Sequence, residues 1–179
     1  MEQERKIRVA ITQGDTNGVG YEVILKAFAD PAILELCTPI IYGSPKIATY
    51  HRKALNLETN FSIINSAEDA REGRVNLLSC FDDEVKIELG QPSKEAGEAA
   101  LKALDRAMTD FRQGYYDVLV TAPINKATIQ STSFHFPGHD TWPARRRSGR
   151  TCRCQRNRQQ DMVQRPECPS LPVLQWPEQ

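Results

Sequence analysis

The stretch IRVAITQGDTNGVGYEVILKAFA, residues 7–29, decides the fold class. Residues 7–11 are rich in β-branched side chains, and residues 14–20 contain three glycines. Residues 21–29 then carry apolar side chains at the i, i+4 spacing of a helix. A strand, a glycine-rich loop and a helix in this order are typical of the opening of a βαβ unit.

The same alternation continues along the chain. Ser93 and Gly114 are suited to begin and end the longest predicted helix as an N-cap and a left-handed terminator. Residues 74–80 and 84–89 alternate in polarity and predict an antiparallel pair or a hairpin. Together the pattern predicts an α/β fold, with a parallel or mixed sheet and helices on both faces. The other predicted strands span residues 39–43, 61–64 and 117–122, and the predicted helices span residues 45–56 and 93–113.

Charge and composition divide the 179-residue chain into two regions. Residues 1–139 hold 15 Lys and Arg against 19 Asp and Glu, whereas residues 140–179 hold 8 Arg, no Lys and 4 acidic residues. The second region also lacks Ile, Phe and Tyr, so it has little apolar surface to bury. We therefore predict a partial α/β domain over residues 1–139 and an atypical Arg-, Pro- and Cys-rich tail over residues 140–179.

Three short segments carry residues suited to bind a ligand. ITQGDTNGVGYE, residues 11–22, places Gly14, Asp15 and Asn17 in a loop before a helix, where a backbone can approach an anion. VTAPINK, residues 120–126, places Asn125 and Lys126 after a strand, and a lysine there can hold a phosphate or carboxylate. Each segment also has a purely structural interpretation, as a tight turn or as a solvated lysine.

The third segment is FPGH, residues 136–139. A histidine after a glycine turn can act as a general acid or base, donate to a ligand or bind a metal. A surface or structural role is the alternative for His139 taken alone.

Taken together, these segments resemble the 4-hydroxythreonine-4-phosphate dehydrogenase family. ITQGDTNGVGYE, a G-x-P-S…G turn at residues 90–97, VTAPINK and FPGH occur in the order and spacing of that family. The resemblance covers roughly residues 7–139.

The resemblance implies an oxidoreductase that uses NAD and a divalent cation (Zn, Mg or Co). It implies oxidation and decarboxylation of 4-phosphohydroxy-L-threonine to 3-amino-2-oxopropyl phosphate, in pyridoxal phosphate (vitamin B6) synthesis. The implied fold is like that of isocitrate and isopropylmalate dehydrogenases, here truncated to most of one domain, and the implied assembly is a cytoplasmic homodimer with a phosphorylated small-molecule substrate.

Individual residues follow from the resemblance as well. His139 matches the substrate-contacting histidine of a G-H-T-E motif, but Asp140 stands where that motif has threonine and Thr141 comes one place late. Gly14, Asp15, Asn125 and Lys126 match positions near the cleft, and Asn17 joins them as a cleft candidate. No catalytic residue is assigned.

The resemblance stops at His139. No histidine follows it, so the three metal-binding histidines of the family have no counterpart and no metal ligand is assigned. The abrupt change suggests translation of a shifted reading frame. We expect the chain to be inactive alone, as a non-catalytic fragment.

Two other interpretations concern the tail. The seven arginines from Arg145 to Arg158 offer an alternative role as a nucleic-acid-binding arm, against which stands the lack of aromatic residues interleaved with them. Cys152, Cys154 and Cys168 leave a tetrahedral zinc site one ligand short. No apolar stretch is long enough to span a membrane.

Overall fold

The computed structural model describes residues 6–81 and 85–129. Five parallel strands form one sheet in the order β3-β4-β2-β1-β5. In chain order the elements are β1 (Ile7–Thr12), α1 (Gly20–Ala27), α2 (Ile33–Leu36), β2 (Cys37–Gly43), α3 (Pro45–Ala54), β3 (Phe61–Ile64), a 3-10 helix (Ala67–Asp69), β4 (Val75–Ser79), α4 (Lys94–Gln113), β5 (Val118–Thr121) and α5 (Lys126–Ile129).

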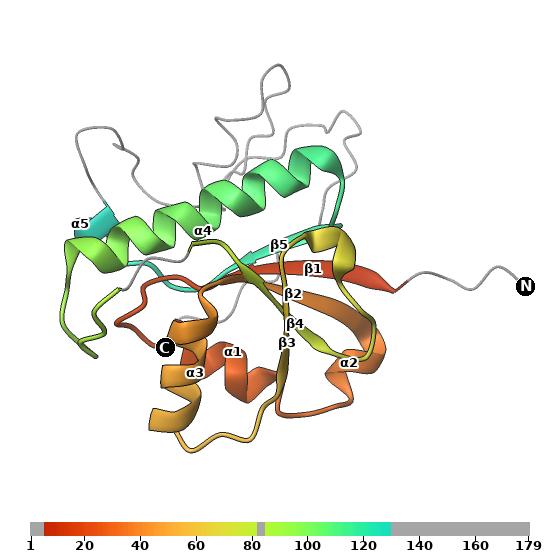
Figure 1. The fold of residues 1–179 in the computed structure, drawn as a ribbon, viewed down its shortest axis with the longest axis horizontal. Coiled ribbons are helices and arrows are strands. Elements are labelled where there is room, and N and C mark those ends of the chain that lie inside the picture. The colour runs from red at the N-terminus through yellow and green to blue at the C-terminus, as the bar shows by residue number, and fades with distance from the viewer. Residues whose placement is uncertain (1–5, 82–84, 130–179) are drawn as a thin grey trace, which may run out of the picture.

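Helices cover both faces of this sheet. Figure 1 shows α4 lying across one face and α1 and α3 packed on the other. The predicted α/β class is therefore confirmed, and the sheet formed by the described residues is wholly parallel rather than mixed.

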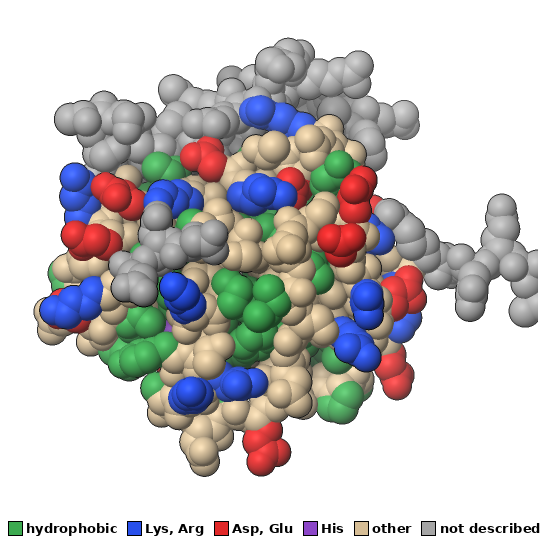
Figure 2. All heavy atoms as spheres, in the orientation of Figure 1, with side chains coloured by type: hydrophobic (Ala, Val, Ile, Leu, Met, Phe, Trp, Pro, Cys, Tyr) green, Lys and Arg blue, Asp and Glu red, His purple; other side chains and the backbone are tan. Residues whose placement is uncertain are grey.

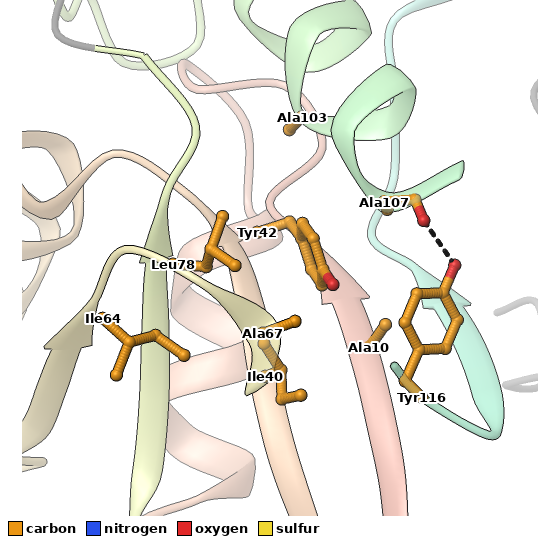
Figure 3. Close-up of a cluster of buried hydrophobic side chains, with 9 residues drawn as sticks. All are labelled: Ala10, Ile40, Tyr42, Ile64, Ala67, Leu78, Ala103, Ala107 and Tyr116. Atoms are coloured by element: carbon orange, nitrogen blue, oxygen red, sulfur yellow. Dashed lines mark hydrogen bonds between the residues drawn. The ribbon is translucent and has the colours of Figure 1, made fainter. Parts of the chain in front are cut away.

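Side chains from each strand alternate between two hydrophobic clusters, because successive residues of a strand point to opposite faces. On the α4 face, Ala10, Ile40 and Tyr42 pack against the small side chains of Ala103 and Ala107 (Figure 3). On the opposite face, strand residues pack against α1 and α3, with Ile11, Ile41, Leu77, Tyr21, Ile24 and Ile47 among the members. The alanine-rich face of α4 lets that helix lie close to the sheet.

The ends of α4 are as predicted. The Ser93 hydroxyl oxygen accepts a hydrogen bond from the Ala96 N–H at 3.1 Å, which satisfies an otherwise unpaired helix donor. Gly114 ends the helix with φ +76°. Pro45 occupies the first turn of α3, as its lack of an N–H favours.

The predicted antiparallel pair at residues 74–80 and 84–89 is wrong. β4 lies parallel between β3 and β2, and no strand forms among the described residues 85–89. The polarity of the segment is misleading because Asn76 is fully buried. Its amide donates to the carbonyl oxygens of Pro39 and Arg71, at 3.1 and 3.0 Å, so a polar residue fits an interior strand.

Two smaller differences have simple causes. The strand predicted at residues 117–122 is apolar, yet the four residues of β5 are only half-buried because β5 lies at the edge of the described sheet. Helix α2 was not predicted, since its four residues are too few to show a helical period.

The described surface carries mixed charge. Figure 2 shows acidic and basic side chains interspersed around a central group of hydrophobic side chains, with no continuous field of one sign on that face. None of the helices within residues 6–81 and 85–129 combines the length and apolarity needed to cross a membrane.

Candidate functional site

The loops that follow β1 and β5 meet at the carboxyl edge of the sheet. β1 and β5 are parallel neighbours, with Thr12 opposite Thr121 in register. The chain leaves β1 toward α1 on one face of the sheet, and it leaves β5 toward α5, which packs against α4 (Figure 1). In open α/β sheets, ligands bind where neighbouring strands connect to opposite faces. This edge is therefore the candidate site.

Gly14 lets the two loops touch. The Asp15 N–H donates to the Pro123 carbonyl oxygen at 2.9 Å. Gly14 has φ +71°, and a Cβ added there would lie 2.3 Å from the same oxygen. The absence of a side chain at Gly14 is thus required by a close approach of the protein to itself.

The turn before α4 joins the same edge. The Asn17 side chain donates to the Gln91 carbonyl oxygen at 2.9 Å, and the Gly90 N–H donates to the Asn17 carbonyl oxygen at 2.8 Å. Gly97 approaches α5 so closely that an added Cβ would lie 2.1 Å from the Thr128 carbonyl oxygen. Three of the four segments that carry the family resemblance are therefore in contact.

A buried network of polar groups around Gln13 anchors the start of the glycine loop to the surrounding structure. The Gln13 side-chain oxygen accepts from the Tyr21 hydroxyl at 2.7 Å and from the Ser44 N–H at 3.2 Å, and its side-chain nitrogen donates to the Ala99 carbonyl oxygen at 3.3 Å. Burial raises the pKa of Tyr21 far above its usual range. Tyr21 therefore stays protonated and acts as a structural donor rather than a base.

His51 holds the middle of the glycine loop. Its Nε2 lies 2.8 Å from the Thr16 carbonyl oxygen, and because a carbonyl only accepts, Nε2 carries the proton. The ring stacks on Tyr21 with centroids 5.2 Å apart, and its exposed fraction is 3%. Burial lowers the pKa of His51, against smaller raising effects of the Thr16 hydrogen bond and of Glu22. The imidazole is consequently held neutral.

His51 is not among the residues predicted from the sequence for this edge. The available signal was its position one turn after Ile47, on the buried face of α3. That pattern indicates a packed histidine but not the loop that it contacts.

The VTAPINK segment ends at the short helix α5. The Asn125 side-chain oxygen accepts from the Ala127 N–H at 3.0 Å, and so begins the turn that leads into α5. Lys126 is exposed to solvent at the start of α5. An exposed cation on a loop beyond a strand is free to meet an anionic ligand.

The predicted site residues divide into two groups. Gly14, Asp15 and Asn17 belong to the loop after β1, and Asn125 and Lys126 belong to the loop after β5, so all five lie at one edge of the sheet. The predictions for His139, for Thr141 and for the cysteines and arginines of the tail concern residues outside the described ranges.

Within residues 6–81 and 85–129, no three His, Cys, Asp or Glu side chains come together to hold a metal ion. The described residues therefore do not fit the divalent cation that the resemblance implies, and no chemical step is assigned to it here.

Four N–H groups of the glycine loop are used within the protein and are not offered to the phosphates of NAD. A phosphate-binding loop needs backbone N–H groups that point at the anion. Here the N–H groups of residues 13, 15, 17 and 18 donate to oxygen atoms of the protein itself. The Asp15 side chain is engaged too, as its carboxylate accepts from the Asn17 N–H at 2.9 Å.

Comparison with known proteins identifies the family of this chain. The family model for the pyridoxal phosphate biosynthetic protein PdxA matches residues 35–155. The chain belongs to the PdxA family. The predicted resemblance is thereby confirmed.

Individual proteins similar in sequence to this chain support the family assignment. A 4-hydroxythreonine-4-phosphate dehydrogenase of Bacteroides thetaiotaomicron is 64% identical over 137 residues, which are 76% of this chain and 38% of that protein. A D-threonate 4-phosphate dehydrogenase of Cupriavidus necator is 29% identical over 133 residues, which are 73% of this chain and 40% of that protein. The chain spans about two fifths of the length of the curated relatives it matches.

The fold agrees with a solved PdxA-family structure. The crystal structure of a 4-hydroxythreonine-4-phosphate dehydrogenase from Burkholderia phymatum superposes with a TM-score of 0.71 at 29% identity. The superposition covers 79% of this chain and 44% of that one. The described sheet therefore corresponds to part of a larger dehydrogenase fold.

Proposed function

We propose that residues 1–139 are part of an NAD-dependent 4-hydroxythreonine-4-phosphate dehydrogenase. The proposed reaction oxidises and decarboxylates 4-phosphohydroxy-L-threonine to 3-amino-2-oxopropyl phosphate in pyridoxal phosphate synthesis. The observation that carries the proposal is the 64% identity over 137 residues to a protein of that name. The meeting of three family segments at one edge of the sheet supports it.

Within this proposal, the described residues shape and charge one wall of a cleft. Gly14 and Asp15 join the loops after β1 and β5. Lys126 offers a cation at the exposed rim of this wall, and Asn125 beside it offers an amide. Both would attract the phosphate or carboxylate of the substrate. His139 and Thr141 are proposed to contact the substrate, as the family resemblance implies.

The remaining machinery is proposed to lie outside the described residues. NAD supplies the hydride acceptor, and a divalent cation (Zn, Mg or Co) polarises the reacting oxygen atoms when it is bound. The proposed working form is a cytoplasmic homodimer. The chain of 179 residues is proposed to be inactive by itself, because no histidine follows His139 to match the three metal-binding histidines that the family resemblance implies.

An assay of NADH formation tests the proposal on three proteins. They are this chain, the Bacteroides thetaiotaomicron relative, and a chimera in which residues 1–139 precede the remainder of that relative. With 4-phosphohydroxy-L-threonine, NAD and a divalent cation, we expect activity in the relative and the chimera but not in this chain. A folded chimera without activity beside an active relative would refute the proposal.

A second substrate belongs in the same assay. The D-threonate 4-phosphate dehydrogenase of Cupriavidus necator matches the same region at 29% identity. Because 64% identity favours the hydroxythreonine substrate, we expect the chimera to have a higher kcat/KM for 4-phosphohydroxy-L-threonine than for D-threonate 4-phosphate. A higher kcat/KM for D-threonate 4-phosphate would instead favour D-threonate 4-phosphate as the substrate of the protein to which residues 1–139 belong.

A further inference from the structure

Asn17 ties the glycine loop to the segment that precedes α4. Its side-chain nitrogen donates to the Gln91 carbonyl oxygen at 2.9 Å and to the Ser93 hydroxyl at 3.4 Å, and its side-chain oxygen accepts from the Glu88 N–H at 3.0 Å. The Asn17 main chain adds a fourth contact, in which its carbonyl oxygen accepts from the Gly90 N–H at 2.8 Å. One buried residue thus makes four hydrogen bonds across two loops.

These contacts leave the amide little capacity to bind a ligand. Both hydrogens of a carboxamide nitrogen can donate once, and here they have two acceptors. The exposed fraction of Asn17 is 4%. Asn17 is therefore poorly placed to touch a substrate directly, although it lies in the loop that the family resemblance marks.

The segment it holds has few other attachments. Residues 88–92 are exposed, including Leu89 with an exposed fraction of 51%. Within the described part of the chain, the hydrogen bonds that tie residues 88–91 to the glycine loop all run through Asn17. The hydrogen bonds that hold this exposed segment against the glycine loop therefore come from one residue, through the side chain and the main-chain carbonyl group of Asn17.

We propose that Asn17 is a positioning residue, whose carboxamide fixes residues 88–91 as a wall beside the glycine loop and so sets ligand affinity at this edge. The structural part of the proposal stands on the hydrogen bonds. The effect on affinity rests on the proposed dehydrogenase function.

Asn76 provides a matched control. It is also a buried asparagine, and its side-chain nitrogen donates to the carbonyl oxygens of Pro39, Arg71 and Arg74 while its oxygen accepts from the Arg71 N–H. These bonds link β4 to β2 and to the turn before β4, and none involves residues 88–91. Asn76→Ala should weaken the fold without a selective effect on that segment.

Amide hydrogen exchange in the full 179-residue chain tests the structural part. Asn17→Ala should speed exchange of the Glu88 amide about tenfold or more relative to the core amides of Ile11 and Ile41, since it removes the side-chain oxygen that accepts from that N–H. Asn17→Asp, which keeps the acceptor and loses the donor, should speed exchange less at Glu88. Equal exchange in wild type and Asn17→Ala, or the same local change in Asn76→Ala, would overturn the assignment.

Kinetics of the chimera test the effect on affinity. Asn17→Ala should raise KM for the phosphorylated substrate or for NAD about tenfold and change kcat less, because uniform binding is lost while the reacting groups stay in place. A fall in kcat with both KM values unchanged would contradict the proposal. If the unsubstituted chimera is inactive, the proposed function fails, and the exchange experiment alone decides the role of Asn17.

Discussion

The N–H of Asp15 donates to the carbonyl oxygen of Pro123 at 2.9 Å, and this bond joins the loop after the first strand to the loop after the fifth. Beside it, Ala122 N–H donates to the Thr12 carbonyl oxygen at 3.2 Å, which extends the β1–β5 ladder by one more bond. The geometry of the glycine loop therefore depends on β5 being in place.

Gly14→Ala should destabilise the protein by about 3 kcal/mol, because a left-handed backbone and a collision with Pro123 act together. Gly73→Ala is the control, since Gly73 has φ +70° but nothing within 4 Å of an added Cβ. We expect about 1 kcal/mol for that variant. Urea unfolding measures both, and equal losses would show that Pro123 can move away without cost.

Gly97→Ala should also destabilise, by about 2 kcal/mol, although the same change in an open helix stabilises by about 1 kcal/mol. The reason is that an added Cβ would lie 2.1 Å from the Thr128 carbonyl oxygen, so α5 must shift. The neighbouring Glu98→Ala, on the exposed side of α4, should change stability by less than about 0.5 kcal/mol. A more stable Gly97→Ala variant would contradict this account of the α4–α5 contact.

His51 should make stability fall as the solution is acidified. Burial lowers its pKa in the folded state below the ordinary value of 6.5, so the unfolded chain binds a proton more readily. The contribution of His51 is full above pH 6.5 and is lost as the pH falls through that value toward the folded pKa.

The test compares wild type with His51→Gln, whose side-chain nitrogen could still donate to the Thr16 carbonyl oxygen. The difference in unfolding free energy, wild type minus variant, should shrink between pH 7 and pH 5, by at most about 1.4 kcal/mol per pH unit. A difference that stays constant with pH would mean that His51 titrates alike in both states.

Tyr42→Phe should cost about 1–3 kcal/mol, because it removes a donor from a buried carboxylate. The Tyr42 hydroxyl donates to Asp110 at 3.0 Å, and Asp110 has an exposed fraction of 2%. Arg106, which donates to the other carboxylate oxygen at 3.2 Å, remains as a partner. Tyr50→Phe, at an exposed tyrosine, is the control in the same thermal or urea unfolding experiment. Equal losses of stability in the two variants would show that the buried hydrogen bond from Tyr42 to Asp110 does not stabilise the fold.

Much of the fold was predictable because local signals agreed with the tertiary structure. The glycine loop, the Ser93 cap and the Gly114 terminator each specify a local conformation, and each occurs as expected. The direction of β4 was not predictable, since Asn76 interrupts an apolar strand and its partners lie elsewhere in the sequence. Strand order is a long-range property of this kind.

The candidate site was predictable as a set of segments but not as a set of contacts. The sequence places Asp15 and Asn17 in a loop before a helix, yet it does not show that Asn17 holds the turn at Gly90 or that His51 reaches Thr16 from α3. Such partners are fixed by how the layers pack. A polar residue in a glycine loop can equally bind a ligand or a neighbouring turn, and only the packed chain distinguishes them.

The late position of β5 in the chain has a consequence for synthesis on the ribosome. The first four strands can emerge and pair among themselves while residues 118–123 are still to be added, since β5 pairs only with β1 among the described strands. Until Pro123 emerges, the nascent glycine loop lacks the carbonyl oxygen that Asp15 requires. The edge where the glycine loop meets the loop after β5 is therefore the last part of this sheet to take shape as the polypeptide grows.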